Sequence, residues 1–474
     1  MTATPGTTVP FLDLGELEDR DNVDLRPTEA VKHPANPVLQ PGHAREWDCK
    51  RVGNWAGDIH WDADESVFKC WYYGSYLEGI SSIGYALSAD GVLWEKPRLG
   101  LYDYGGSTDN NICFRPVTGA TSHFCLRIDD DAPAGRRYQA LTWSDAHGID
   151  GKRNFPYYSP DGIHWTLTPT PERACAIGDT ADVIDDPADP DPERRIKVYT
   201  QHGAWYGPDL EHLRQGPRTV IDPANGREQE IHFIYALPYR GAYVMLYDFD
   251  AVIPWPHHAE PLGTRKRRKL AAGAYAGDCR LAVSRDGLGP FRRIRPDLPV
   301  IPMGDWGTWD DELLVLGGGS MIPFDDRVVL FYTALSHFGT GFLSYPYFKC
   351  EMGMATLRRD GFTHLCNRDG LTQATATTAP IEAGAAPAAV HLNVSDLRPY
   401  RDWIEVEVLD ADSGQVVPGY GREDCRHVIT EGLSVPVRWD AHADLGATPS
   451  RFRLRFYLWG RARLYSFAFE EVDR

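Results

Sequence analysis

Short apolar runs separated by turn residues dominate this chain, and long helical patterns are nearly absent from it. The runs are alternating or continuously apolar, and Gly, Pro, Asp and Asn stand between them. This order is typical of strands joined by tight turns. Aromatic strands are predicted at residues 68–73, 138–143, 196–200, 243–247 and 328–332. The pattern therefore predicts an all-β protein.

A short motif, Ser-x-Asp-Gly followed by an aromatic residue, recurs downstream of these strands. Its first two copies end in Trp94 and Trp165, and looser copies follow, so that the repeated acids are Asp90, Asp161, Asp209, Asp286 and Asp360. An Asp-Gly pair is a strong hairpin signal, because Gly supplies the positive φ that such turns need. Five such units placed radially would hide their sheet edges in a five-bladed β-propeller. The alternative is a β-sandwich whose hairpins share the same turn chemistry.

The composition and the hydrophobic pattern of the sequence change after Phe362. Residues 370–390 are rich in Ala and Thr, as in a linker or a loose strand, and cleanly alternating segments follow at 391–394, 404–409, 433–439, 451–458 and 463–469. About 100 residues of such strands predict a β-sandwich. A chain of 474 residues is long enough for two domains. We expect an N-terminal arm (1–44), a propeller (45–365) and a C-terminal β-sandwich (366–474).

Charge and end sequences limit the partners and the location. Asp and Glu number 67 against 49 Lys and Arg, a net charge of −18. Such a surface repels nucleic-acid phosphates and anionic lipid, and no apolar run approaches the roughly 20 residues that span a bilayer. The N-terminus lacks the basic and apolar regions of a secretory signal, and the nine cysteines are scattered without a Cys-x-x-Cys pair. We expect a cytoplasmic protein, with a processed precursor left open.

Acidic residues recur in the segments predicted to form the innermost strands. These segments precede the aromatic second strands, and they contain Asp58 (54–61), Asp179 and Asp182 (178–184), Glu230 (228–235), and Asp310 and Glu312 (306–313). Innermost strands line the channel of a propeller, and a pocket forms where the channel opens. Any one of these acids could instead cap a strand or a turn. Their recurrence at equivalent places favours a shared acidic pocket.

Three acids in an aromatic pocket suit the cleavage of a glycosidic bond. One must deliver a proton to the leaving oxygen, and a second must be ionised to attack the anomeric carbon or to activate water. A third can hold sugar hydroxyls and shift the pKa of the others. Trp and Tyr side chains would stack on sugar faces.

At these residues the sequence resembles the five-bladed propeller glycoside hydrolases of families 32, 43, 62 and 68, in particular family-32-like bacterial proteins with a C-terminal β-sandwich. Three patterns of these enzymes have a counterpart here. The place of their Asn-Asp-Pro-Asn-Gly is occupied by Gly57-Asp58-Ile59-His60, and that of their Arg-Asp-Pro by Gly178-Asp179-Thr180. The segment from Glu230 occupies the place of their Glu-Cys-Pro-Asp-Leu-Phe. The resemblance implies that Asp58 is the nucleophile or base, Asp179 the transition-state stabiliser and Glu230 the proton donor. Both Asp-Pro dipeptides are missing here. The Ser-x-Asp-Gly motif is also similar to the Asp-box of sialidases, a turn on the outer face that carries no chemistry.

Further side chains are candidates for substrate contact. His60 and His232 each follow an acid by two residues and therefore face the same side of the strand. Asp310 and Glu312 are related in the same way. If the match of the first-blade pattern to Asp58 is wrong, this pair is the alternative for the nucleophile position. The full set is Trp55, His60, Asp182, His232, Trp306, Trp309, Asp310, Glu312 and His337. The sequence assigns no metal and no cofactor.

The predicted activity is that of an O-glycosyl hydrolase acting, in the exo manner, on a furanosidic linkage of the fructofuranoside or arabinofuranoside type. A transglycosylase, a non-catalytic carbohydrate-binding propeller and a glycoside phosphorylase are the alternatives. The phosphorylase needs a phosphate clamp, for which Arg51, Arg127 and Arg280 are scattered candidates. The expected partner is an oligosaccharide or glycoside substrate. The sandwich shows no obvious aromatic platform, and a homo-oligomer formed through it is left open.

Overall fold

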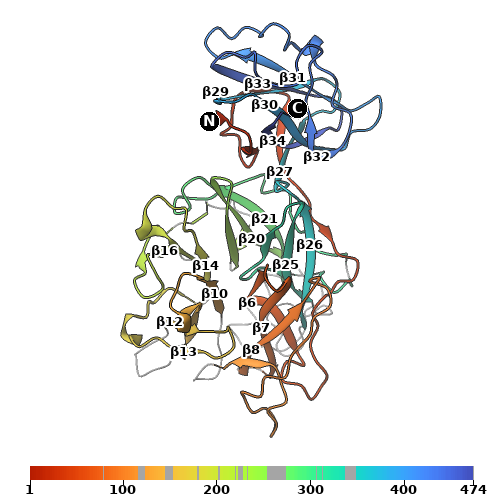
Figure 1. The fold of residues 1–474 in the computed structure, drawn as a ribbon. Coiled ribbons are helices and arrows are strands. Elements are labelled where there is room, and N and C mark those ends of the chain that lie inside the picture. Colours follow the sequence, from red (N-terminus) through yellow and green to blue (C-terminus); the bar gives the residue numbers. More distant parts are fainter. Residues whose placement is uncertain are drawn as a thin grey trace. The chain divides into compact units, whose positions relative to one another are not determined.

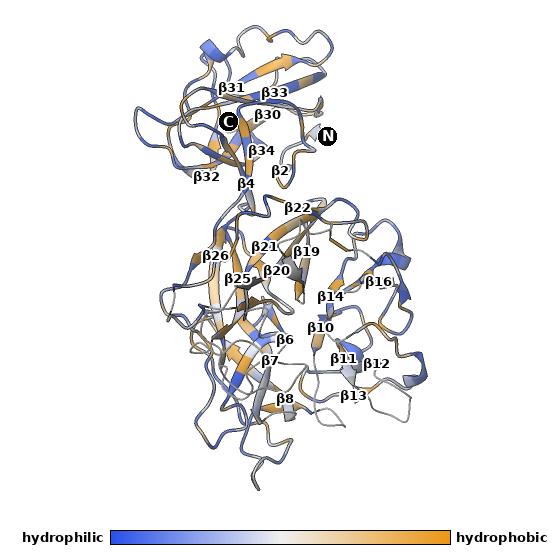
Figure 2. Cartoon of the chain, turned by 180° about the vertical axis from the view of Figure 1, so that it is seen from behind, coloured by the Kyte–Doolittle hydropathy of each residue, from blue (hydrophilic) through white to orange (hydrophobic). Residues whose placement is uncertain are grey.

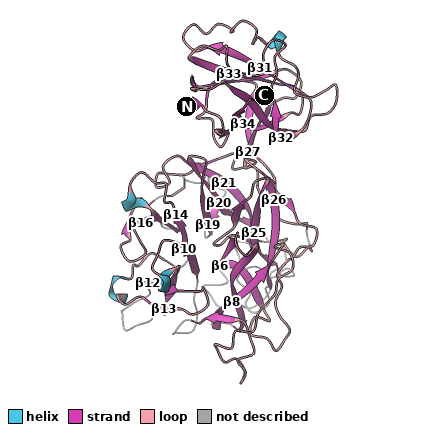
Figure 3. Ribbon diagram, in the orientation of Figure 1, coloured by secondary structure: helices cyan, strands magenta, loops and turns pink. Residues whose placement is uncertain are grey.

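The computed structural model describes the chain except for residues 78–79, 116–122, 145–152, 179–180, 201–202, 219, 222–227, 232, 254–273, 306, 312, 337–348 and 473–474. Within the described residues nearly all regular structure is β (Figure 3). The helices there are single 3₁₀ turns at Ala134–Arg136, Pro171–Arg173, Pro192–Arg194 and Arg422–Asp424. None of these described helices has the length or apolarity to cross a membrane. The all-β prediction is confirmed.

The chain divides into two compact units. One contains Met1–Thr28, Phe324–Val328 and Leu357–Arg474, and the other contains Glu29–Pro323 and Val329–Thr356. Residues 1–44, expected to be one arm, are thus shared between the units. The first unit is the β-sandwich and the second is the propeller.

The propeller consists of five blades of antiparallel strands (Figure 1). Single parallel pairs link the described strands of blades 4, 5 and 1 into one 14-stranded sheet, and blades 2 and 3 are separate four-stranded sheets. The strands of each blade are given from the innermost outward. Blade 1 is β6 (Arg51–Asp62), β7 (Val67–Leu77), β8 (Ile80–Ser88) and β9 (Ile112–Phe114). Blade 2 is β10 (Phe124–Ile128), β11 (Tyr138–Ser144), β12 (Arg153–Ser159) and β13 (Thr166–Leu167). Blade 3 is β14 (Ala181–Asp185), β15 (Ile196–Thr200), β16 (Gly203–Gly207) and β17 (Arg214–Gln215).

The last two blades have interrupted inner strands. Blade 4 is β18 (Glu228–Glu230) with β19 (Ile234–Tyr239), then β20 (Ala242–Ile253), β21 (Ala274–Ser284) and β22 (Arg292–Arg293). Blade 5 is β23 (Leu313–Val315) with β24 (Met321–Pro323), then β25 (Arg327–Ser336), β26 (Lys349–Arg358) and β5 (Val31–Lys32). Each inner strand contacts the inner strand of the next blade: β6 contacts β10, β10 contacts β14, β14 contacts β19, and β19 contacts β24. The inner strands therefore surround a common axis. The five predicted aromatic strands are all second strands.

The N-terminal segment closes the ring. β5 precedes blade 1 in sequence, yet it pairs antiparallel with β26 as the outermost strand of blade 5. The Lys32 Nζ lies 2.5 Å from Asp310 Oδ2, and the Asn36 amide donates to the carbonyl of Met354. Closure of this kind removes the open edge that the last blade would otherwise present.

The Ser-x-Asp-Gly motif forms the turn from the third to the fourth strand of a blade. In blade 2, Asp161 Oδ1 accepts the backbone N–H groups of Ile163 and His164, both at 2.9 Å. The glycine at the turn has a positive φ of 77°, and its carbonyl accepts the indole N–H of Trp71 from blade 1 at 2.6 Å. The motif therefore ties blade 2 to blade 1.

The same contact recurs between blades 3 and 4. There Tyr199 donates its hydroxyl to the carbonyl of Gly287 at 2.6 Å. Blade 3 carries the degenerate motif with Leu210 in place of Gly, and it packs against Leu141 of blade 2 instead of an aromatic donor. Where the motif of one blade lacks its glycine, the preceding blade thus also lacks the aromatic hydrogen-bond donor.

The copy at Asp360 follows a different path. It comes after β26, where the chain continues into the sandwich strand β27 (Thr363–Asn367) instead of an outer propeller strand. Asp360 has a positive φ of 57° and accepts a hydrogen bond from Ser466. This copy is therefore part of the sandwich, and β5 supplies the missing outer strand of blade 5.

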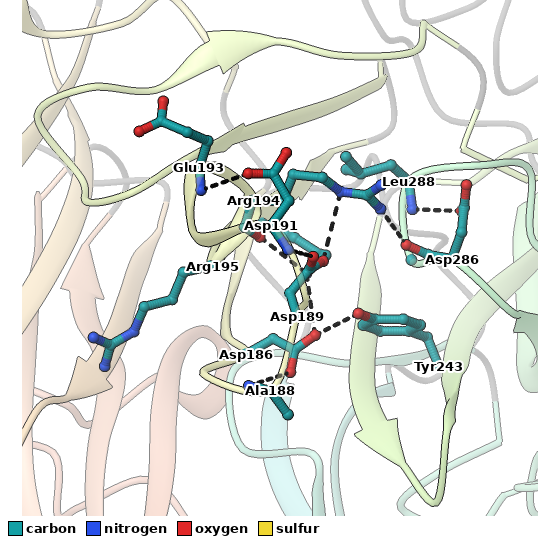
Figure 4. A network of polar contacts seen from close by, with 12 residues as sticks. Asp186, Ala188, Asp189, Asp191, Glu193, Arg194, Arg195, Tyr243, Asp286 and Leu288 are labelled. Atoms are coloured by element: carbon teal, nitrogen blue, oxygen red, sulfur yellow. Dashed lines mark hydrogen bonds and ion pairs between the residues drawn. The ribbon is translucent and has the colours of Figure 1, made fainter.

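A buried polar network joins blade 3 to blade 4 (Figure 4). Lys197 is fully buried and its Nζ contacts Asp189 at 2.8 Å and Asp186 at 3.2 Å. Tyr243 of blade 4 donates to Asp186. Arg194 reaches across to the carbonyl of Asp286 at 2.5 Å, whereas Arg195 points the other way, as Figure 4 shows. Charges buried at this interface are paired, as a low-dielectric environment requires.

Hydrophobic residues gather on the strands and hydrophilic residues in the loops (Figure 2). The interface of blades 1 and 2 is largely aromatic and includes Trp71, Phe114, Phe124, Tyr138 and Phe155. This packing fixes the inner strands that carry the candidate site.

The sandwich has two sheets, six-stranded in the described residues. One contains β1 (Thr2–Ala3), β3 (Leu17–Asp21), β28 (Ala374–Thr378), β29 (Ile381–Ala383), β31 (Ile404–Asp410) and β33 (Arg451–Leu458). The other contains β2 (Thr8–Pro10), β4 (Val23–Pro27), β27, β30 (Ala388–Ser395), β32 (Gly432–Pro436) and β34 (Arg463–Glu471). Phe11 packs on Phe456 and Phe467 in the core. The Ala/Thr-rich segment, expected to be a linker or a loose strand, supplies β28, which lies between β33 and β3.

Candidate functional site

Asp58 lies on the innermost strand of blade 1 with its side chain buried. Its Oδ2 accepts the backbone N–H of Leu126 on β10 at 2.7 Å. Its Oδ1 accepts the N–H of Ile59 at 2.9 Å and lies 3.1 Å from Nε2 of His60. His60 lies on the same side of the strand as Asp58, as their two-residue spacing predicts. Hydrogen bonds from two sides hold this carboxylate in one orientation.

Asp182 repeats this arrangement in blade 3. Its Oδ2 accepts the backbone N–H of Ala236 on β19 at 3.0 Å, and its Oδ1 has no hydrogen-bond partner among the described residues. Burial raises the pKa of Asp182 well above its ordinary value, and the charge of Asp58 raises it further, against the opposing hydrogen bond from Ala236. Burial and the neighbouring charge of Asp58 thus both favour the protonated form of Asp182.

Tyr235 of blade 4 belongs to the same group. Burial raises the pKa of its phenol well above the ordinary value, and the charges of Asp182 and then Asp58 add to the effect. Sequence reasoning did not single out Tyr235. The available signal was a polar aromatic residue within an otherwise apolar inner strand. We call Asp58, Asp182 and Tyr235 the channel group.

Three successive glycines bring blade 5 against this group. The backbone of Gly318 donates to the carbonyl of Gly57 at 3.0 Å and accepts from the N–H of Ile59 at 3.2 Å. A Cβ on Gly318 would lie 2.1 Å from Asp58 Oδ2, and Gly319 has a φ of 68°. Only residues without a side chain allow this approach. The run of three glycines was a usable signal that sequence reasoning missed.

Trp55, a predicted sugar-stacking residue, is half-buried three positions before Asp58. Its ring lies 4.5 Å from that of Tyr73 and 5.8 Å, edge to face, from that of Phe233 in blade 4. Its indole N–H has no hydrogen-bond partner among the described residues. An amphipathic ring with a spare donor suits contact with a polar ligand.

Buried polar side chains fix the backbone next to two other predicted acids. Asn154 Oδ1 accepts the N–H groups of Ile177 and Gly178 at 2.8 and 3.1 Å, directly before residue 179. Asp248 Oδ1 accepts the N–H of Phe233 at 2.9 Å, three residues after Glu230. These contacts stabilise the entrances to the inner strands of blades 3 and 4.

Several predicted site residues fall outside the description. Glu230 ends β18, where its backbone lies opposite Asp250 of β20, but its side chain is outside the described atoms. The residues wholly outside the described part are Asp179, His232, Trp306, Glu312 and His337.

Asp310 and Trp309 lie in a turn before β23, so the expectation of an inner-strand position for them is wrong. Thr308 donates its hydroxyl to Asp310, and the ion pair with Lys32 engages the same carboxylate. Trp309 lies 5.7 Å from the ring of Tyr332. The turn forms because this segment bonds to itself and to β5, and it is not part of the channel group.

The arginines considered for a phosphate clamp are not gathered. Arg127 contacts Asp129 at 2.8 Å and Asp185 at 2.5 Å, and Arg280 contacts Asp278 at 2.6 Å. Both guanidinium groups are therefore neutralised by carboxylates. The part of the chain that the structure describes contains no cluster of three or more His, Cys, Asp or Glu side chains able to hold a metal.

No family model matches the sequence, and no curated protein matches it. Among solved structures, a glycosyl hydrolase from Bacteroides ovatus is similar over 70% of this chain and 94% of its own, with 15% identity and a TM-score of 0.44. The exo-inulinase of Aspergillus awamori is similar over 93% and 99%, with 12% identity and a TM-score of 0.38. A structure from work on the family 130 mannoside phosphorylases and hydrolases is 16% identical over 70% and 94%, with a TM-score of 0.45. At these values the likenesses carry no conclusion about activity.

Proposed function

We propose that this protein is a glycoside hydrolase that cleaves a furanosidic linkage at the hollow of its propeller. The observation that carries the proposal is the channel group, in which Asp58 and Asp182 are buried on the inner strands of separate blades and each accepts a backbone N–H of the next blade. Its two carboxyls have different environments: burial raises the pKa of Asp182, which accepts one backbone N–H from the next blade, whereas Asp58 accepts N–H donors on both oxygens. Acid–base cleavage of a sugar bond requires carboxyl groups held in different environments.

In the proposed mechanism Asp58 is the nucleophile or base and Glu230 the proton donor. Asp179 stabilises the positive charge that develops on the sugar ring in the transition state. The fixed backbone beside residue 179, held by Asn154, supports this arrangement. Trp55 would contact the sugar face. The furanosidic specificity and the cytoplasmic location rest on the sequence and are proposals.

Replacement of the proton donor tests the proposal. We expect Glu230→Gln to lower kcat on nitrophenyl furanosides by about 10²–10⁴-fold while substrate binding is retained. Glu228→Gln, on the same strand, is the control for the change of charge. Nitrophenyl pyranosides test the sugar class, and NMR of the released anomer distinguishes retention from inversion. Unchanged turnover in Glu230→Gln would exclude Glu230 as the acid, and wild-type turnover of pyranosides alone would overturn the furanosidic assignment.

A further inference from the structure

A pocket lies in blade 1 and shares no lining residue with the channel group. Its volume is about 400 Å³, within the usual range of small-molecule sites. Two chain segments line it, one before β6 and one between β8 and β9. The lining residues are Arg45, Glu46, Trp47, Asp48, Lys96, Arg98, Tyr104, Ser107, Asp109, Asn110 and Asn111. We call it the blade 1 pocket.

An ion pair between the buried Asp48 and the partly exposed Lys96 forms one wall of the blade 1 pocket. Asp48 is 1% exposed, and its Oδ2 accepts from Lys96 Nζ at 2.7 Å and from the Tyr72 hydroxyl at 2.8 Å. The ammonium of Lys96 also lies over the Tyr72 ring, 5.3 Å from its centroid. The ion pair is therefore fixed in place before any ligand arrives.

An asparagine organises the adjoining wall. Asn111 accepts the indole N–H of Trp47 at 2.8 Å, and its amide donates to the Tyr72 hydroxyl and to the Tyr85 carbonyl, both at 2.8 Å. The Trp47 ring in turn packs against Gly74 and Gly84, where a Cβ would lie 2.5 and 2.6 Å from the indole. The glycines thus admit the tryptophan that supports this wall.

Tyr104 supplies an aromatic surface. Its ring meets that of Tyr76 edge to face at 4.9 Å, and its backbone bridges to Ser107 across two glycines with φ of 64° and 85°. The turn at Gly105 and Gly106 therefore holds the half-buried Tyr104 at the rim of the pocket.

The charges of the lining identify the class of ligand. Three basic residues (Arg45, Lys96, Arg98) face three acidic ones (Glu46, Asp48, Asp109), so the formal charges cancel. A phosphate or a carboxylated sugar would meet the buried Asp48 without a net positive charge to offset it. A sugar hydroxyl both donates and accepts, so it can satisfy neighbouring donors and acceptors at once.

We propose that the blade 1 pocket binds one or two units of a neutral saccharide, between the Tyr104 ring and the polar wall of Asp48, Lys96 and Asn111. This binding does not depend on catalysis at the channel group. It would let the protein hold a glycan at a point other than the bond that is cleaved.

The test uses the full chain and two independent variants of the pocket. Tyr104→Ala removes the aromatic surface, and Ser107→Trp fills the opening from an exposed position without removing a buried contact. Tyr400→Ala is the matched control, because Tyr400 is 99% exposed in the sandwich. Binding is first screened on an array of neutral oligosaccharides and then measured by calorimetry with the best neutral ligand, with digalacturonate and inorganic phosphate as charged probes.

We expect a neutral saccharide to bind, with at least tenfold weaker affinity in both pocket variants and unchanged affinity in Tyr400→Ala and Asp58→Asn. Nitrophenyl glycoside turnover should be unaffected by the pocket variants, so failure of the proposed catalysis and failure of this inference are read separately. Equal affinity in wild type and both variants, no neutral ligand at all, or preferential binding of digalacturonate or phosphate would each overturn the inference.

Discussion

The carboxylate of Asp58 accepts the backbone N–H of Leu126 at 2.7 Å, which binds the inner strand of blade 1 to that of blade 2. Asp182 makes the same contact with the N–H of Ala236, from blade 3 to blade 4, at 3.0 Å. The same kind of hydrogen bond, from a backbone N–H to an inner-strand carboxylate, therefore joins two pairs of neighbouring blades. Asp58 differs in having His60 beside its second oxygen.

This repetition gives a matched pair of variants. Asp58→Asn and Asp182→Asn each keep an oxygen that can accept the backbone N–H, so both should fold. If Asp58 is the nucleophile or base, Asp58→Asn alone should lower kcat by about 10²–10⁴-fold, measured with a nitrophenyl furanoside. Similar kcat values in the two variants would show that Asp58 has only a structural role, in joining neighbouring blades.

The aromatic contacts to the Ser-x-Asp-Gly turns should stabilise the propeller. Trp71→Phe leaves the carbonyl of Gly162 in the next blade without its donor, and Tyr199→Phe does the same to Gly287. A buried group left unpaired costs about 1–3 kcal/mol. We expect each variant to lower the free energy of unfolding by that amount in urea titrations. Tyr400→Phe, which removes a hydroxyl from an exposed ring, should leave it unchanged.

Ring closure should depend on the ion pair of Lys32 with Asp310. Lys32→Met leaves the nearly buried Asp310 carboxylate without its ammonium partner, and we expect a loss of about 1–3 kcal/mol in the free energy of unfolding. The double variant with Asp310→Asn should recover part of the loss, because no charge is then left unpaired. Asp310→Asn should not change KM. A rise in KM with normal stability would instead indicate that Asp310 contacts the substrate.

His364 should make the sandwich sensitive to acid. Burial above all, and then the charges of Arg463 and Arg26, lower the pKa of this imidazole to about 3. The unfolded chain takes up the proton near pH 6.5, so the free energy of unfolding should fall as the pH drops from about 6.5 to 3, by at most about 1.4 kcal/mol per unit.

The measurement is urea unfolding at several pH values between 7 and 4. His364→Gln can still bond to the Thr28 hydroxyl, which lies 2.9 Å from His364 Nδ1, and it should show a shallower dependence on pH than wild type. Leu371→Ala, an exposed change in the same unit, should keep the wild-type slope. Equal slopes in wild type and His364→Gln would contradict the assignment.

The pairing of Asp58 with His60 and the positions of the second strands could be predicted from the sequence. Both depend on local rules: side chains two apart share a face of a strand, and alternation marks a half-buried strand. The predicted strands at 196–200 and 451–458 match β15 and β33 at both ends. The Asp-Gly turns likewise follow from glycine's tolerance of positive φ.

Contacts between distant segments could not be predicted in this way. β5 has two residues, and Val31 is 71% exposed, so no local pattern marks it as a strand; pairing with β26 makes it one. β2 and β4 join the sandwich through partners more than 300 residues away. Asp310 looked like an inner-strand acid, but its turn and Lys32 place it at the ring closure.

The sequence by itself thus determined the repeating strands and turns and the acids on the inner strands of blades 1 and 3. Only the tertiary structure decided that the charges of Asp58 and Asp182 act on Tyr235, that β5 completes blade 5, and that the first 28 residues belong to the sandwich. The physical reason is that backbone periodicity acts over a few residues, whereas the position of a carboxyl group depends on which distant N–H groups and charges surround it after folding.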